Sequence, residues 1–192
     1  VLTHLPQEIQ PRVIDNALAT HTSGLRALLA SARPDEALLQ YSLDNEQAVL
    51  RALRSMSRLV VADLGSGMSA SLMRLQREVD HLVVVVDPVP VTLNMARDLL
   101  RDIQPSRPEG SKTHVVVVNR AAATTPPAWN EVEQALGTEI RAIIALASEL
   151  ALHSLQAQVP MVLYQPSAIA STQLAKLAEE LTVRVRATSQ VP

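Results

Sequence analysis

The 192-residue chain contains no cysteine and no phenylalanine, and only one tryptophan and two tyrosines. Without cysteine it can form neither disulfides nor thiolate metal sites, which fits a reducing compartment. Without phenylalanine its core must be built from Leu, Val, Ile, Ala and Met. No apolar run approaches the roughly 20 residues that a membrane-spanning helix needs. No signal-peptide pattern is recognisable either.

The chain also has no large excess of either positive or negative charge. Lys and Arg together number 17 against 19 Asp and Glu, for a net charge of -2. No cluster of basic residues compensates for this balance, so nucleic acid is not expected as a partner. The five histidines follow no metal-ligand spacing, and we expect them on the surface.

The chain does contain several continuous apolar runs. Such runs, without polar alternation, are typical of strands covered on both faces of a parallel sheet. Four of these runs are clear strand candidates: 58–64, 81–87, 113–119 and 140–146. Two more, 25–31 and 159–165, are weaker candidates.

Helical patterns lie between these runs. Residues 44–56 begin with Asp44 as a possible N-cap, and residues 126–137 end on Gly137, a helix stop. Further helices are expected at 92–103, 148–158 and 167–182. Strands alternating with helices predict an α/β fold, a doubly wound and mostly parallel sheet with helices on both faces.

Ligands of such sheets gather at the carboxyl ends of the strands. The segments that follow the four clear runs are therefore the candidate site: 63–69, 87–92, 119–125 and 146–149. The first contains Asp63 followed by Gly-Ser-Gly, and this stretch admits two interpretations.

One interpretation is a Rossmann-like methyltransferase that binds S-adenosylmethionine. Gly65 and Gly67 would let the backbone approach the methyl donor, and Asp87 would bind its ribose. Three observations count against it: Ser69 stands where a glycine is usual, aromatic residues are scarce, and Asp87 is followed by Pro-Val-Pro. We keep it as the alternative.

The other interpretation rests on the order of several segments from about Leu5 to Leu181. They are "HTSGLRALLASARPDEA", "SRLVVADLGSGMSAS", "EVDHLVVVVDPVPVTLNMARDLLRDI", "THVVVVNRAA" and "VPMVLYQPSAIASTQLAKLAEEL". This order resembles the MinD/ParA superfamily of deviant P-loop ATPases, most closely its CpaE/TadZ branch of pilus-assembly proteins.

The resemblance implies roles for particular residues. Asp63 would match the Walker B aspartate, which holds a magnesium-bound water, and Asn119 would contact adenine. Gly65 and Arg120 would complete the nucleotide contacts. The implied cofactors are ATP and Mg. The implied protein is a cytoplasmic homodimer, polar and peripheral to the inner membrane, that localises the Flp/tight-adherence pilus machinery. Asp63 and Asn119 can also simply close turns.

The phosphate-binding part of that superfamily is absent from this sequence. None of the five glycines belongs to a G-x-x-x-x-G-K-[ST] motif. We therefore expect residues 1–183 to be a MinD/CpaE-like domain without its P-loop segment, residues 184–192 to be a tail, and the chain alone to be non-hydrolytic. The missing part would precede Val1. A sheet without it should expose an apolar edge and self-associate.

Overall fold

The computed structural model describes residues 1, 4–30, 42–67, 69–119 and 128–188, with side chains up to residue 182. The chain divides into two compact units, Val1–Val79 and Asp80–Pro192. Each is described by itself.

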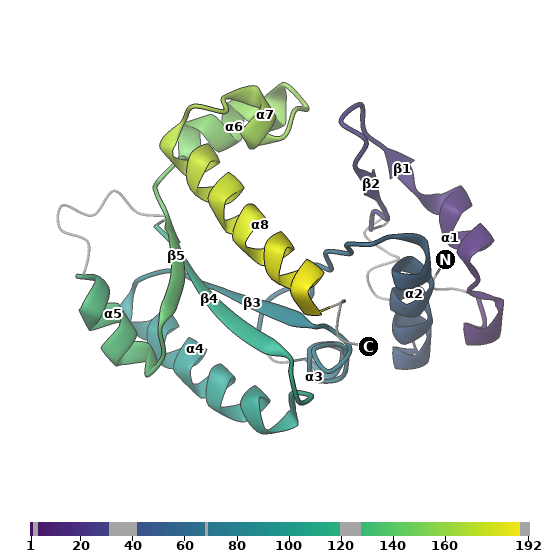
Figure 1. The fold of residues 1–192 in the computed structure, drawn as a ribbon, viewed down its shortest axis with the longest axis horizontal. Helices are drawn as coiled ribbons and strands as arrows, with labels where there is room; N and C mark the ends of the chain where they lie inside the picture. The colour runs from purple at the N-terminus through teal and green to yellow at the C-terminus, as the bar shows by residue number, and fades with distance from the viewer. Residues whose placement is uncertain (2–3, 31–41, 68, 120–127, 189–192) are drawn as a thin grey trace. The chain divides into compact units, whose positions relative to one another are not determined.

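A parallel three-stranded sheet forms the centre of the second unit (Figure 1). Its strands are β3 (His81–Val86), β4 (Lys112–Val118) and β5 (Ile140–Ile144), in the order β3-β4-β5. The valine-rich runs form strands because branched side chains pack well on a pleated surface. This confirms the strands predicted at 81–87, 113–119 and 140–146, and it confirms the α/β class.

Two helices cover one face of this sheet (Figure 1). They are α4 (Pro90–Ile103), which η3 (Gln104–Ser106) extends, and α5 (Trp129–Leu136). Burial of each large apolar side chain contributes about 1.5–3 kcal/mol. The buried set comprises Leu82, Val84, Val86, Leu93, Ala96, Ile103, Val115, Val117, Val132 and Leu136.

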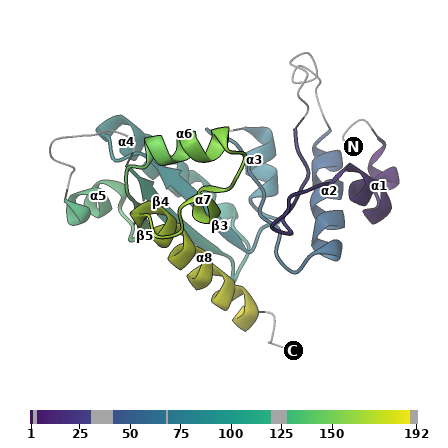
Figure 2. The same ribbon diagram turned by 90° about the horizontal axis from the view of Figure 1, so that it is seen from above.

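The other face carries α6 (Ser148–Gln156), α7 (Met161–Tyr164) and α8 (Ile169–Thr188), which Figure 2 shows on the viewer's side. Helix α8 packs its Ala170 against Val116 and Ile144. Leu174 and Leu177 are half-buried in the same cluster. Ala178, one residue further along α8, is exposed.

Two features near the start of β3 were not indicated by the sequence: a contact between two histidines and a partly buried arginine. His114 is buried, contrary to expectation, and its Nε2 lies 3.0 Å from Nδ1 of His81. Arg107 donates from Nη2 to the Lys112 carbonyl over 3.3 Å. Burial lowers the pKa of the Arg107 guanidinium, an effect that the nearby Asp80 carboxylate opposes.

The first unit is mainly helical. It comprises η1 (Pro6–Glu8), α1 (Pro11–Ala17), α2 (Leu43–Met56) and α3 (Ala70–Leu75), with a short antiparallel pair of β1 (Ala19–Thr20) and β2 (Arg26–Ala27). Its core is Ile9, Ile14 and Ala52 with half-buried neighbours.

Two predicted strands and one predicted N-cap were wrong. Residues 58–64 belong to no strand, and Leu59 and Val61 are 54% and 88% exposed. An apolar run becomes a strand only where a neighbouring edge pairs with it, and no strand of the described residues pairs with this run. Residues 161–164 form helix α7 instead of a strand. The N-cap of α2 is Ser42, whose Oγ accepts from Asp44 N–H over 3.2 Å, and not Asp44.

No helix in the described ranges is long and apolar enough to cross a membrane.

Candidate functional site

Polar residues follow two neighbouring strands of the sheet where each strand ends. Asp87 comes directly after β3 and Asn119 directly after β4. Because the strands are parallel and adjacent, both residues lie at the same end of the sheet, where the strands have their carboxyl ends. The Asn119 N–H donates to the Ile144 carbonyl over 3.0 Å, which prolongs the β4–β5 ladder by one bond. This bond fixes the position of the Asn119 backbone.

Asp87 is held through its backbone and not through its side chain. Its carbonyl accepts from Val89 N–H over 2.8 Å and from the Thr92 hydroxyl. Its Oδ1 is buried and accepts no hydrogen bond within the described part of the chain. A buried oxygen without a partner is uncommon and marks a place where water, an ion or a ligand fits. The sequence signal was an acidic residue at the end of a buried valine run.

The segment after β5 is fixed by helix α8. Gln173 Oε1 on α8 accepts from the Ala145 N–H over 2.8 Å. Helix α6 then begins at Ser148 with no side-chain cap, and Glu149 lies in its first turn. Residues 146–149 therefore follow the end of the third strand, and Glu149, the one charged residue among them, is exposed.

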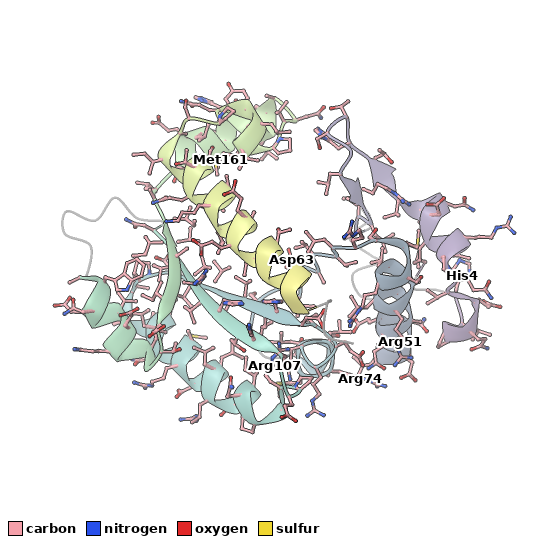
Figure 3. The ribbon with its side chains drawn as sticks, viewed as in Figure 1. His4, Arg51, Asp63, Arg74, Arg107 and Met161 are labelled. Carbon is pink, nitrogen blue, oxygen red and sulfur yellow. The ribbon has the colours of Figure 1, made fainter. Side chains whose placement is uncertain are left out.

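Asp63 lies in the first unit, in the loop between α2 and α3 (Figure 3). Its Oδ1 accepts from the Gly65 N–H over 2.9 Å, and the residue is exposed. Gly65 and Gly67 have φ of 76° and 74°, in the left-handed region that only glycine adopts readily. An added Cβ at either glycine would meet nothing within 4 Å. The glycines are therefore required by the backbone conformation and not by a close approach of another part of the chain.

The loop leads into a capped helix. Ser69 Oγ accepts from the Leu72 N–H over 3.0 Å and begins α3. Ser71 donates to Glu46 on α2 over 3.0 Å, which ties the start of α3 to α2. The two serines of the motif thus have structural roles in the first unit.

The residues present fit only part of a magnesium nucleotide. An exposed carboxylate at Asp63 suits a magnesium-bound water, and the Asn119 amide suits the edge of adenine. Phosphate binding needs a cation beside a loop of backbone amides. The chain has two lysines: Lys112 begins β4, at the amino ends of the strands and away from Asn119, and Lys176 is on α8. Within the described ranges no three His, Cys, Asp or Glu side chains gather as a metal site.

Of the four predicted nucleotide contacts, Asp63 and Gly65 lie together in one loop of the first unit, and Asn119 ends a strand of the second. Arg120 lies outside the described residues.

The architecture is that of an α/β domain with a parallel sheet between two layers of helices, as in P-loop ATPases of the MinD/ParA type. Three solved structures have the same fold. A ParA family ATPase from Chlorobium tepidum superposes with a TM-score of 0.80 at 16% identity, over 92% of this chain and 72% of that protein. The septum site-determining protein MinD from Pyrococcus horikoshii, complexed with Mg-ADP, gives 0.74 at 14% identity over 88% and 68%.

The MinD cell division protein of Aquifex aeolicus gives 0.67 at 17% identity, over 88% of this chain and 69% of that protein. No family model and no curated protein matches the sequence. The likeness therefore concerns the fold. It agrees with the α/β fold that the sequence predicts.

Proposed function

We propose that this chain is the larger part of a MinD/ParA-type switch domain from a CpaE/TadZ-like protein. Its role is to localise and assemble pilus secretion machinery at the cell pole, as a peripheral cytoplasmic homodimer. In the intact parent the switch depends on ATP and Mg. This chain by itself does not hydrolyse ATP.

The observation that carries the proposal is the fold, which corresponds to a ParA family ATPase over 92% of the chain. The order of polar residues supports it: an aspartate before a glycine loop, and an asparagine at the end of a central strand. The MinD of known structure that binds Mg-ADP has the same fold. The pilus branch is supported by the order of the sequence segments alone.

Within the parent, the residues have separate tasks. Asp63 would orient a magnesium-bound water, and Gly65 would keep the loop in the conformation that presents this carboxylate. Asn119 would bind adenine through one donor and one acceptor, and Arg120 would add a charged contact. Nucleotide binding would order these loops and favour the dimer.

The lack of hydrolysis follows from the missing phosphate contacts. Phosphoryl transfer is accelerated by positioning and by neutralising charge on the phosphates. Neither lysine of this chain belongs to a G-x-x-x-x-G-K-[ST] motif. Without that lysine and its amide nest, the nucleotide would lose the strongest interactions with its triphosphate.

The test is isothermal calorimetry with Mg-ATP, Mg-ADP and S-adenosylmethionine, on this chain and on the protein translated from further upstream. We expect Mg-ATP to bind the longer protein, and we expect no phosphate release from this chain. Asp63→Ala should weaken binding to the longer protein, whereas Glu109→Ala, also exposed, should not. Heat with S-adenosylmethionine alone would overturn the proposal.

The cellular role has a separate test. A fluorescent fusion of the parent protein should form polar foci, and deletion of its gene should abolish surface pili. Uniform fluorescence together with normal piliation would contradict the pilus assignment and leave the nucleotide switch standing.

A further inference from the structure

A hollow of about 580 Å³, the α4–α5 groove, lies between helices α4 and α5 at the amino ends of strands β4 and β5. The two helices pack beside each other on one face of the sheet (Figure 1). The groove is lined, among others, by Arg97, Arg101, Thr113, Val115, Leu136 and Thr138, which all belong to the second unit. It is therefore separate from the strand ends that carry Asp87 and Asn119.

The bottom of the α4–α5 groove is apolar and its upper part is polar. Val115 and Leu136, at the bottom, are 2% and 3% exposed. Thr113 is half-buried and Thr138 is exposed, and neither hydroxyl forms a hydrogen bond within the described residues. Ligand sites typically have a volume of roughly 300–1,000 Å³, with an apolar lining and a few polar groups that orient the ligand. The groove thus has the size and the composition of a binding site.

Both charged residues of the lining are arginines, one helical turn apart on α4. Arg101 is held by carboxylates outside the groove, since its Nη1 lies 3.1 Å from Asp98 and its Nε 3.3 Å from Asp102. Asp98 approaches Arg97 only at Nε, at 4.0 Å. Within the described part of the chain, the two terminal nitrogens of Arg97 have no partner. They can therefore donate two parallel hydrogen bonds to one carboxylate.

The exposure of the rim indicates the kind of ligand. Arg97, Arg101 and Thr138 are all exposed, so the groove is open to solvent along its upper part. A small molecule usually has roughly 70–90% of its surface covered in its site. A peptide segment needs less, because it can lie along an open groove and insert single side chains.

We propose that the α4–α5 groove binds a short acidic segment of a partner protein. An aliphatic side chain of this segment enters the apolar bottom, over Val115 and Leu136. A neighbouring carboxylate accepts two hydrogen bonds from Arg97, and the hydroxyls of Thr113 and Thr138 bond to the backbone of the segment. The inference does not rest on the proposed nucleotide function, because the groove lies at the opposite ends of the strands.

The first test is an NMR titration of the whole chain with the acetylated peptide Glu-Glu-Leu-Leu-Glu-Glu. The amide signals of Thr113, Gly137 and Thr138 should shift, whereas those of Asp87 and Asn119 should not. A peptide with alanine in place of leucine should bind more weakly, because it lacks the apolar side chain. Unshifted signals at Gly137 and Thr138 would overturn the proposal.

A basic peptide is the main alternative, because the last carbonyls of α5 carry partial negative charge. The peptide with lysine in place of glutamate tests it. We expect this peptide to bind the native chain more weakly than the glutamate peptide does. Tighter binding of the lysine peptide would show that the arginines do not select the ligand, and the proposal would be wrong.

Arg97→Gln should weaken binding of the glutamate peptide about tenfold, as expected when one charged hydrogen-bonding group is lost. Arg12→Gln, at an exposed arginine of α1 outside the groove, is the matched control and should leave the affinity unchanged. Arg97→Glu should reverse the preference, so that the lysine peptide binds more tightly than the glutamate peptide. Thermal unfolding of each variant checks that the fold is intact. Equal affinities of the native chain and a folded Arg97→Gln variant would contradict the contact.

Discussion

The Oδ1 atom of Asp63 accepts a hydrogen bond of 2.9 Å from the N–H of Gly65, two residues further on. The side chain thereby closes a turn, an arrangement that aspartate commonly makes before glycine. The same carboxylate is the one that the sequence indicates for magnesium. The turn and the charge can be separated experimentally, because asparagine retains the acceptor and removes the charge.

We expect Asp63→Asn to change the free energy of unfolding by no more than about 0.5 kcal/mol, in urea denaturation, because the turn persists. In the longer parent the same substitution should weaken Mg-ATP binding, measured by fluorescence titration. Asp98→Asn, on the exposed face of α4, serves as the charge control. Unchanged Mg-ATP affinity would show that Asp63 acts only in the turn.

Asp87→Ala should raise the free energy of unfolding by up to about 1 kcal/mol. Its buried Oδ1 has no hydrogen-bond partner among the described residues, which costs about 1–3 kcal/mol. The favourable interaction of the carboxylate with the start of α4 is smaller, about 0.3–1 kcal/mol. The bonds to Val89 and Thr92 involve the backbone carbonyl and survive. A loss of stability in thermal unfolding would indicate a bound partner at Oδ1.

Gly137→Ala should destabilise the chain by about 1 kcal/mol. Gly137 ends α5 with φ of 70°, and its N–H donates to the Glu133 carbonyl over 2.8 Å. Because a Cβ there would meet nothing within 4 Å, the cost is conformational and not steric. Gly137→Asn should recover part of it, since asparagine tolerates this conformation. Equal losses for both variants in chemical denaturation would contradict this explanation.

Arg141 on β5 and Glu180 on α8 form an ion pair and are 27% and 33% exposed. A double-mutant cycle with Arg141→Met and Glu180→Gln should give a coupling energy of about 1 kcal/mol. The exposed pair of Arg101 and Asp98, 3.1 Å apart, should give close to zero. Equal couplings for the two pairs would show that the partial burial of Arg141 and Glu180 is unimportant.

His81 and His114 share one hydrogen bond, so one ring must donate the proton and the other must accept it. Their planes differ by 5° and their centroids are 5.2 Å apart, close to the largest separation that a 3.0 Å contact between ring nitrogens permits. The rings therefore lie edge to edge. His81→Ala should change the tautomer populations of His114 in ¹⁵N NMR at a pH where both rings are neutral. His153→Ala, on α6, should not.

Most of the second unit could be predicted from the sequence. Its strands are runs of branched apolar residues that are mostly buried, with Val83 and Val85 of β3 as exceptions. A proline and a glycine mark the beginning of α4 and the end of α5. The run at 58–64 has the same composition and forms no strand. The composition of a segment indicates that it favours an extended backbone. It forms a strand only where another strand is available for hydrogen bonding.

The candidate site was predicted in the same uneven way. Asn119 was found because it follows a buried strand, and the parallel ladder places it where the pattern indicated. The sequence indicates Asp87 by its place after an apolar run, but not the burial of one of its carboxylate oxygens, because this burial depends on how α4 packs over the sheet. The buried His114 was missed for a similar reason: histidine is common at surfaces, and only the pairing of β3 with β4 brings it against His81.

By itself, the sequence determined the α/β class, the strands of the central sheet, the lack of a G-x-x-x-x-G-K-[ST] motif, and the polar residues at the strand ends. These features depend on neighbours along the chain, which composition and periodicity record. The tertiary structure alone decided that β3 pairs with β4 alone among the described strands, that Val83 and Val85 are partly exposed, and that 58–64 forms no strand. Each of these features depends on which segments, distant in the sequence, pack against one another. The local sequence of a strand does not specify which segment that will be.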